Sequence, residues 1–256
     1  MNDAQGREPA EPTGGGEPDP AEFSGVALGR LARVFTEPMK AFSEIAAAPT
    51  WVLPLLVMAL LALAVQFVIV PRIDFEATMR QAMEERSSSG RELSDEQVDR
   101  IVATQRKVAR VMGYAAPLTT ALVFLLLGGA YFLTMKLFGS EAEFGRVFSA
   151  VLHASLPATV TKTAILGVVA AQRESFAAQE LEQLVRSSVG AWLDPATSKP
   201  LLALANGIDL FNAWQWVLLV IGLSAAGRIS RVKAAWVVAV LWGVWLGGKA
   251  ALAALF

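Results

Sequence analysis

The sequence contains no cysteine and a single histidine, His153. Disulfides and thiolate nucleophiles are therefore excluded, and a histidine-based metal site has only one potential ligand. No P-loop, HExxH or GxSxG pattern occurs in the chain. Charged residues make up only 18% of the chain and the formal net charge is −1, so no basic field exists to hold nucleic acid. We therefore predict a protein that is not an enzyme, with no catalytic residue, cofactor, metal or nucleic-acid partner.

Hydrophobic residues are abundant instead, at 54% of the chain, and they occur in long runs. Soluble domains contain about 45–50% apolar residues, and a run of about 20 is long enough to cross the roughly 30 Å hydrocarbon layer as a helix. The composition therefore predicts an all-α, polytopic membrane helical bundle with five transmembrane helices over residues 50–256. The predicted spans are Trp51–Val70, Tyr114–Met135, Val147–Ala171, Leu210–Ala226 and Val232–Phe256.

Two segments of different character precede the first span. Residues 1–22 are rich in proline, glycine and acid, and such a segment cannot bury enough apolar surface to order itself. We predict a disordered cytoplasmic tail there. Residues 23–49 are amphipathic: Phe42 and Ile45 share one helical face, and Arg30 lies on the polar side. They are predicted to be amphipathic interfacial helices on the membrane surface, and the alternative is helices packed on the protein itself.

Two polar segments interrupt the spans. Residues 72–110 contain eight basic and eight acidic residues, and their pattern predicts a solvated helical hairpin that extends the membrane helices. Ser94 and Gln97 have the spacing of a capping box, which predicts the start of the second helix of this hairpin. Residues 172–209 are predicted to hold a short helix and turns.

Basic residues in the short loops indicate the orientation of the protein. The link between the fourth and fifth spans carries Arg228, Arg231 and Lys233 and no acid. Lysine and arginine gather in cytoplasmic loops, and with five spans this link lies on the same side as the N-terminal region. We therefore predict a cytoplasmic N-terminus.

Lys162 is an ionisable residue inside the predicted third span, Val147–Ala171. It lies nine residues before Ala171, which places it roughly 13 Å inside that end of the helix. Its charge could line a polar pathway or serve as counter-ion for an anionic substrate. Alternatively, Lys162 reaches the outer interface with its long side chain or bonds to carbonyl groups freed near Pro157. Both interpretations are open, and no acid occurs inside any predicted span.

His153 and Asp209 are the two other candidate polar residues in the membrane. His153 lies nine residues before Lys162, which places the two side chains on opposite faces of a straight helix. We therefore expect His153 to form a hydrogen bond to another helix rather than to share a site with Lys162. Asp209 directly precedes the fourth span, where a carboxylate caps the helix and interacts favourably with its dipole.

Three stretches of the chain together resemble the YIP family. They are "EPMKAFSEIAAAPTWVLPLL", "GSEAEFGRVFSAVLHASLP" and "IDLFNAWQWVLLVIGLSAAGRISRVKAAWVV". The eukaryotic members of this family are Rab-GTPase-interacting membrane proteins, and the form of this sequence resembles the bacterial branch. The resemblance implies five membrane spans, a cytoplasmic N-terminal region, a role in membrane organisation or vesicle traffic, and no established catalytic residues. It also implies a location in the bacterial inner membrane.

Two functions are compatible with these features. The first is a non-enzymatic scaffold that binds the lipid bilayer and recruits protein partners through the N-terminal amphipathic region or the polar loops. The second is a small-solute transporter, or a subunit of one, that uses a polar site around Lys162. The oligomeric state is left open.

Overall fold

The computed structural model describes residues 20–86, 94–194 and 197–255. Within these ranges the chain is helical and contains no β-strand, which confirms the predicted all-α class. Residues 1–19, which make up most of the predicted disordered tail, and the last residue of the predicted fifth span lie outside the described ranges. The longer helices are α1 (Pro20–Thr36), α2 (Pro38–Ala47), α3 (Val52–Val68), α4 (Phe75–Arg86), α5 (Asp95–Leu137), α6 (Phe144–Ala171), α8 (Lys199–Gly207), α9 (Leu210–Gly227) and α10 (Arg231–Leu255).

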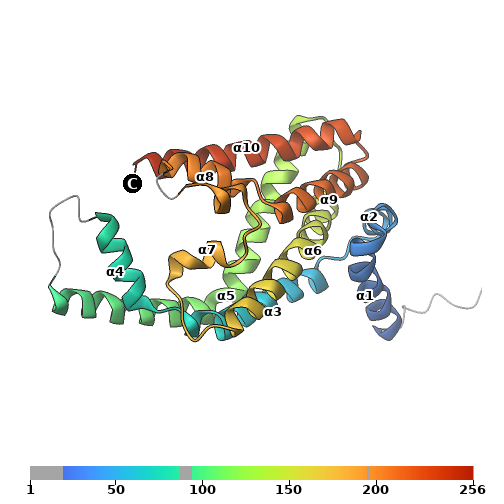
Figure 1. Cartoon of the computed structure of the whole chain (residues 1–256). Coiled ribbons are helices and arrows are strands. Elements are labelled where there is room, and N and C mark those ends of the chain that lie inside the picture. Colours follow the sequence, from blue (N-terminus) through green and yellow to red (C-terminus); the bar gives the residue numbers. More distant parts are fainter. Residues whose placement is uncertain (1–19, 87–93, 195–196, 256) are drawn as a thin grey trace, which may run out of the picture.

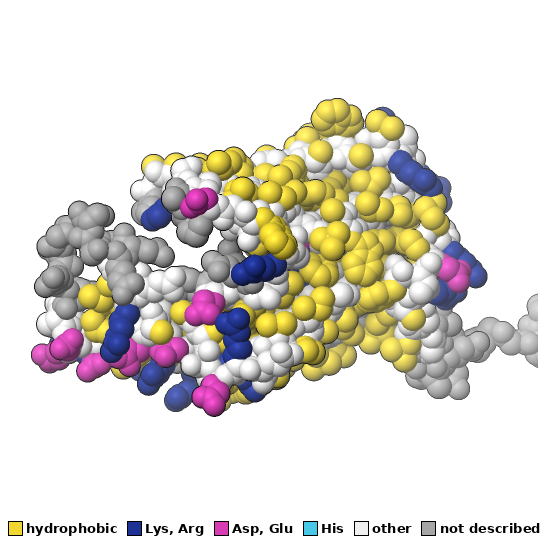
Figure 2. Space-filling view, in the orientation of Figure 1, with side chains coloured by type: hydrophobic (Ala, Val, Ile, Leu, Met, Phe, Trp, Pro, Cys, Tyr) yellow, Lys and Arg dark blue, Asp and Glu magenta, His cyan; other side chains and the backbone are white. Residues whose placement is uncertain are grey.

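Five of these helices are long and apolar enough to cross a membrane: α3 with the short turn that follows it, α5, α6, α9 and α10. This confirms the predicted number of spans. Helix α5 begins at Asp95, well before Tyr114, because the second helix of the predicted hairpin runs into the span without a break. Figure 2 shows hydrophobic side chains over the middle of the molecule, with charged side chains gathered toward its two ends.

The predicted hairpin projects from one end of the bundle. Helix α4 and the first part of α5 extend away from the other helices at the end opposite to α1 and α2 (Figure 1). The Ser94 hydroxyl accepts from the Gln97 backbone N–H, and the Gln97 side chain accepts from the Ser94 backbone N–H, so the predicted capping box is present. Residues 87–93, which connect α4 to α5, lie outside the described ranges.

The N-terminal helices α1 and α2 pack on the bundle. Helix α1 begins at Pro20, inside the expected tail, and Pro38 starts α2 as a proline suits the first helical turn. Phe42 and Ile45 are buried and belong to the same apolar cluster as residues of α6 and α9. This agrees with the alternative interpretation, helices packed on the protein itself. Their position on a membrane surface stays a prediction.

Arg30 does not lie on the exposed polar face that the sequence predicts. Its side chain is buried, its Nη1 donates to the Ala48 carbonyl at 2.8 Å, and its Nε lies 3.8 Å from the Glu44 carboxylate. A buried guanidinium requires such partners because an unpaired buried charge is strongly destabilising. The arginine therefore ties the end of α2 to α1.

Helices α6 and α9 form the centre of the bundle. The first turn of α6 and the end of α9 line the same pocket, which shows that the two helices run in opposite directions. Gly222 allows α9 to approach its neighbours closely: a Cβ at this position would lie 2.8 Å from the Phe42 ring and 3.4 Å from the Ala150 Cβ. Small residues permit such close contact between membrane helices.

Candidate functional site

Asp209 caps helix α9, as the sequence predicts. Its carboxylate accepts from the backbone N–H groups of Phe211 at 2.7 Å and Asn212 at 3.3 Å. These N–H groups have no partner within the helix, so a side-chain acceptor stabilises the helix end. The preceding chain is held in place by backbone pairing between Ser188 and Asp209. Asp209 is therefore a fixed, buried carboxylate at the end of a span.

Lys162 lies beside this carboxylate. Its Nζ is 3.2 Å from Oδ2 of Asp209, and the Ser187 hydroxyl donates to the same oxygen at 2.5 Å. The Asp209 side chain is 3% exposed and the Lys162 side chain 47% exposed, so only the acid is removed from solvent. Neither interpretation of Lys162 made from the sequence includes this acid. Asp209 was missed as its partner because it lies just outside the predicted span.

Helix lengths explain why Lys162 and Asp209 meet. Lys162 is 18 residues beyond the first residue of α6, and Asp209 is 18 residues before the last residue of α9. Because the two helices are antiparallel and the start of α6 lies beside the end of α9, equal residue counts from that end give equal depth, roughly 27 Å along each helix. A count of this kind on the predicted spans is the nearest signal in the sequence, and it pairs the two residues only once α6 and α9 are known to be antiparallel neighbours.

The ion pair lines a pocket of about 310 Å³, which we call the ion-pair pocket. Lys249 of α10 is a second lysine on its wall, and its Nζ lies 5.0 Å from the centre of the Trp245 ring, a cation–π distance. The ion-pair pocket is lined by Lys162, Leu166, Leu181, Val185, Ser188, Asn206, Asp209, Asn212, Trp245 and Lys249.

Several groups act on the pKa of Asp209, which lies just before the membrane-spanning segment. Burial raises this pKa, whereas the hydrogen bond from Ser187, the charge and hydrogen bond of Lys162, and the Phe211 N–H lower it. The lowering effects exceed that of burial, so the pKa lies below its ordinary value. Asp209 is consequently ionised at neutral pH and offers an acceptor, not a proton.

His153 does not belong to this site. It is buried, and its Nδ1 lies 2.8 Å from the Ser149 carbonyl of its own helix. Its Nε2 has no hydrogen-bond partner among the described residues. The expectation that His153 bonds to another helix is therefore wrong. The Gln215 amide of α9 supplies an interhelical bond instead, by donating to Ser155 of α6 at 2.9 Å.

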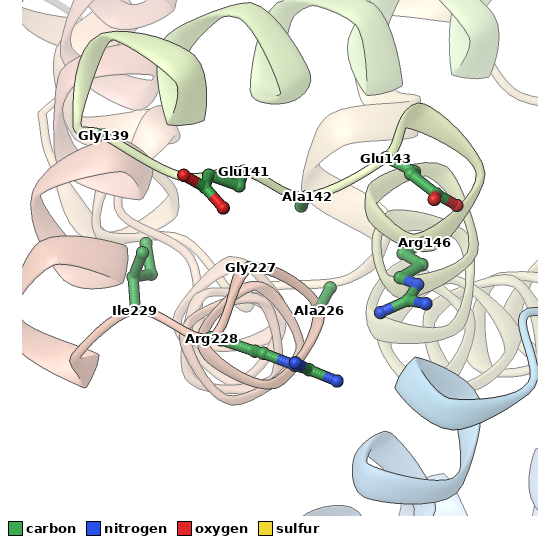
Figure 3. Close-up of a pocket in the computed structure, with 9 residues that line it drawn as sticks. All are labelled: Gly139, Glu141, Ala142, Glu143, Arg146, Ala226, Gly227, Arg228 and Ile229. Atoms are coloured by element: carbon green, nitrogen blue, oxygen red, sulfur yellow. The ribbon is translucent and has the colours of Figure 1, made fainter.

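A second charged pocket, of about 340 Å³, lies at the other end of α6 and α9 (Figure 3). We call it the loop pocket, because the α5–α6 and α9–α10 loops form much of its wall. It is lined by Gly139, Glu141, Ala142, Glu143, Arg146, Ala226, Gly227, Arg228 and Ile229.

Packed apolar side chains separate the two pockets. Val151 of α6 and Leu219 and Leu223 of α9 are at most 2% exposed and belong to one cluster. Among the described residues, no three histidine, aspartate or glutamate side chains come together as metal ligands. The described part of the bundle thus has a charged pocket at each end of α9 and a mainly apolar interior, in which His153 and Ser149 are buried polar residues.

Five apolar helices around such an interior define a polytopic integral membrane protein. The sequence matches the Yip1 domain over residues 32–252, and the chain belongs to the YIP family. No curated protein and no solved structure matches the chain.

Proposed function

We propose that this YIP-family protein is a non-enzymatic scaffold in membrane organisation, with a cytoplasmic N-terminus in the bacterial inner membrane. The observation that supports the proposal is the projecting hairpin formed by α4 and the first part of α5. Helix α5 has 43 residues and is roughly 64 Å long, about twice the hydrocarbon thickness. Its first half therefore stands outside the bilayer with α4 and presents exposed charged side chains such as Glu96 and Arg100. A rigid polar projection of this kind offers a surface to a protein partner.

Transport of a small solute is the second candidate, and the ion-pair pocket is the observation that favours it. Two observations favour the scaffold over it. Asp209 already has partners in Lys162, Ser187 and the backbone, so the acid is satisfied without a solute. In addition, the cluster around Leu219 fills the bundle between this pocket and the loop pocket, and a polar solute crossing it would lose its hydrogen bonds.

Site-specific photo-crosslinking in cells tests the scaffold. A photoreactive amino acid at Ala103, on the exposed face of α5 outside the membrane, should give a discrete crosslinked protein. The matched control is Leu126, which is exposed on the apolar part of the same helix and should contact lipid. Depletion of the protein should also alter membrane morphology.

Uptake by reconstituted vesicles separates the two candidates. The scaffold requires that Lys162→Met leaves solute uptake unchanged. Uptake that depends on Lys162, with no crosslinked partner at Ala103 and normal morphology after depletion, would replace the scaffold by the transporter.

A further inference from the structure

We propose that the loop pocket binds a phosphoethanolamine group, the zwitterionic headgroup of an aminophospholipid. The loop pocket contains two arginines, Arg146 and Arg228, and two acids, Glu141 and Glu143. A phosphoethanolamine group carries the complementary charges, one phosphate and one primary ammonium, at the two ends of a short ethylene link. This inference does not depend on the proposed scaffold function.

The position of the loop pocket fits a lipid headgroup. The pocket lies where α5 and α9 end and where α6 and α10 begin, so four of the five spans bring it to one membrane surface. Leu137, at the end of α5, is 86% exposed, and Val232, in the first turn of α10, is 68% exposed. In a bilayer these apolar side chains would lie against acyl chains, next to a pocket for the headgroup.

The four charged side chains of the loop pocket differ from the Lys162–Asp209 pair. None of them forms an ion pair with another residue in the part of the chain that the structure describes. Figure 3 shows the Arg146 and Arg228 guanidinium groups on the same side of the pocket, with Glu141 on the opposite side. Opposite charges that share a pocket without touching leave room for a ligand that bridges them.

The backbone around the pocket is fixed before any ligand binds. Arg228 has φ 50°, a left-handed conformation that ends α9. The Ser140 hydroxyl donates to the Gly227 carbonyl at 3.2 Å and accepts from the Ala142 N–H at 3.2 Å, which joins the two loops. A Cβ at Gly227 would lie 2.2 Å from Met135 of α5 and 2.7 Å from the Ser140 hydroxyl, so the end of α9 is in close contact with α5 and with the α5–α6 loop. Such preorganisation favours binding.

The chemistry of each wall predicts which headgroups are accepted. The two guanidinium groups donate charge-assisted hydrogen bonds to phosphate oxygens. The Glu141 carboxylate accepts hydrogen bonds from an ammonium group, which has three N–H donors. Choline has a positive charge but no N–H donor, and glycerol has no positive charge. Ethanolamine should therefore be preferred over both. The pocket volume of about 340 Å³ is within the usual range for small-ligand sites, about 300–1,000 Å³.

Competition between lipids, read by native mass spectrometry of the full-length protein, tests the proposal. The protein in detergent is mixed with equal amounts of phosphatidylethanolamine, phosphatidylcholine and phosphatidylglycerol that have identical acyl chains. We expect about fivefold preferential retention of phosphatidylethanolamine, the effect of one additional charge-assisted hydrogen bond at a partly exposed site. Soluble phosphoethanolamine is added in a second arm. Displacement of the lipid supports recognition of the headgroup from either source, and persistence of the lipid supports the phospholipid as the ligand.

Three variants test which side chains of the loop pocket bind the phosphate and which bind the ammonium group. Arg228→Asn removes one guanidinium but keeps a residue that tolerates the left-handed backbone, and Arg146→Gln removes the other. Each should lower retention of all three lipids about fivefold. Glu141→Gln should abolish the preference for ethanolamine while phosphate binding remains. Arg100→Gln, on the projecting part of α5, is the matched control and should change nothing.

Equal retention of the three lipids by the unmodified protein would overturn the proposal. So would an ethanolamine preference that both Arg228→Asn and Glu141→Gln leave intact. Size-exclusion profiles and far-UV circular dichroism establish that each variant is folded, and the pocket side chains concerned have no ion-pair partner to lose among the residues that the structure describes.

Discussion

The two ends of the α6–α9 pair place charged side chains in opposite arrangements. At one end, Lys162 and Asp209 lie 3.2 Å apart and the acid is buried. At the other end, Arg146, Arg228 and Glu141 line one pocket without forming an ion pair among the described residues. The comparison separates two uses of charge in a membrane protein. Charges that satisfy each other hold helices together, and charges that lack a partner are available to a ligand.

Removal of Asp209 should have the largest effect. Asp209→Ala deletes the helix cap, the ion pair and the acceptor of Ser187 together. A lost cap costs about 1 kcal/mol. Breaking a buried ion pair costs about 3–5 kcal/mol, and the cost is smaller here because Lys162 is half-exposed and solvent screens its charge. We expect the free energy of unfolding to fall by roughly 3 kcal/mol, measured by denaturant titration in mixed micelles. Asp99→Ala, an exposed acid of α5, is the control, and an equal effect there would contradict the structural role.

The same acid should make stability depend on pH under acidic conditions. Because the pKa of Asp209 is lower in the folded protein than in the unfolded chain, its contribution is fully present above the ordinary pKa of about 4. That contribution is lost as the pH falls through the folded pKa. The stability difference between the unmodified protein and Asp209→Asn should therefore shrink below about pH 4. A difference that is constant from pH 7 to about pH 3 would contradict this assignment.

Removal of Lys162 should have a smaller effect. Lys162→Met leaves Asp209 with Ser187 and two backbone donors, and the lysine is half-exposed, so we expect a loss of about 1 kcal/mol. Lys249→Met is a matched control in the same pocket, because Lys249 contacts the Trp245 ring and forms no ion pair with a described residue. Thermal unfolding followed by circular dichroism measures both variants. A larger loss for Lys249→Met would contradict the importance of the ion pair.

Removal of charged side chains from the loop pocket should have the smallest effect on the free energy of unfolding. Arg146→Gln and Glu141→Gln change side chains that form no ion pair within the described part of the chain, and such changes usually alter stability by less than about 0.5 kcal/mol. The same denaturant titration in lipid-free detergent measures them. A destabilisation of about 2 kcal/mol or more would mean that these residues are needed for folding and would weaken the comparison.

Much of the fold could be predicted from the sequence, because apolar run length and helix capping are local properties. The five spans, the Ser94 capping box and the Asp209 cap follow from residues that are close together in the chain. The Lys162–Asp209 contact joins residues far apart in sequence and depends on the relative depth of two helices. The burial of Arg30 could not be predicted from the sequence either. Helical periodicity alone does not show that α2 places a carboxylate and a free carbonyl group beside this arginine. That Arg146 and Arg228 form no ion pair with a described residue depends on the loop conformations.

Two parallel double-mutant cycles test the central comparison most directly. One combines Lys162→Met with Asp209→Asn, and the other combines Arg228→Asn with Glu141→Gln, with the free energy of unfolding measured in lipid-free detergent. We expect a coupling energy of about 1 kcal/mol for the first pair and zero within error for the second. Zero coupling between Lys162 and Asp209, or a clear coupling between Arg228 and Glu141, would contradict the assignment of a structural pair at one end and a ligand site at the other.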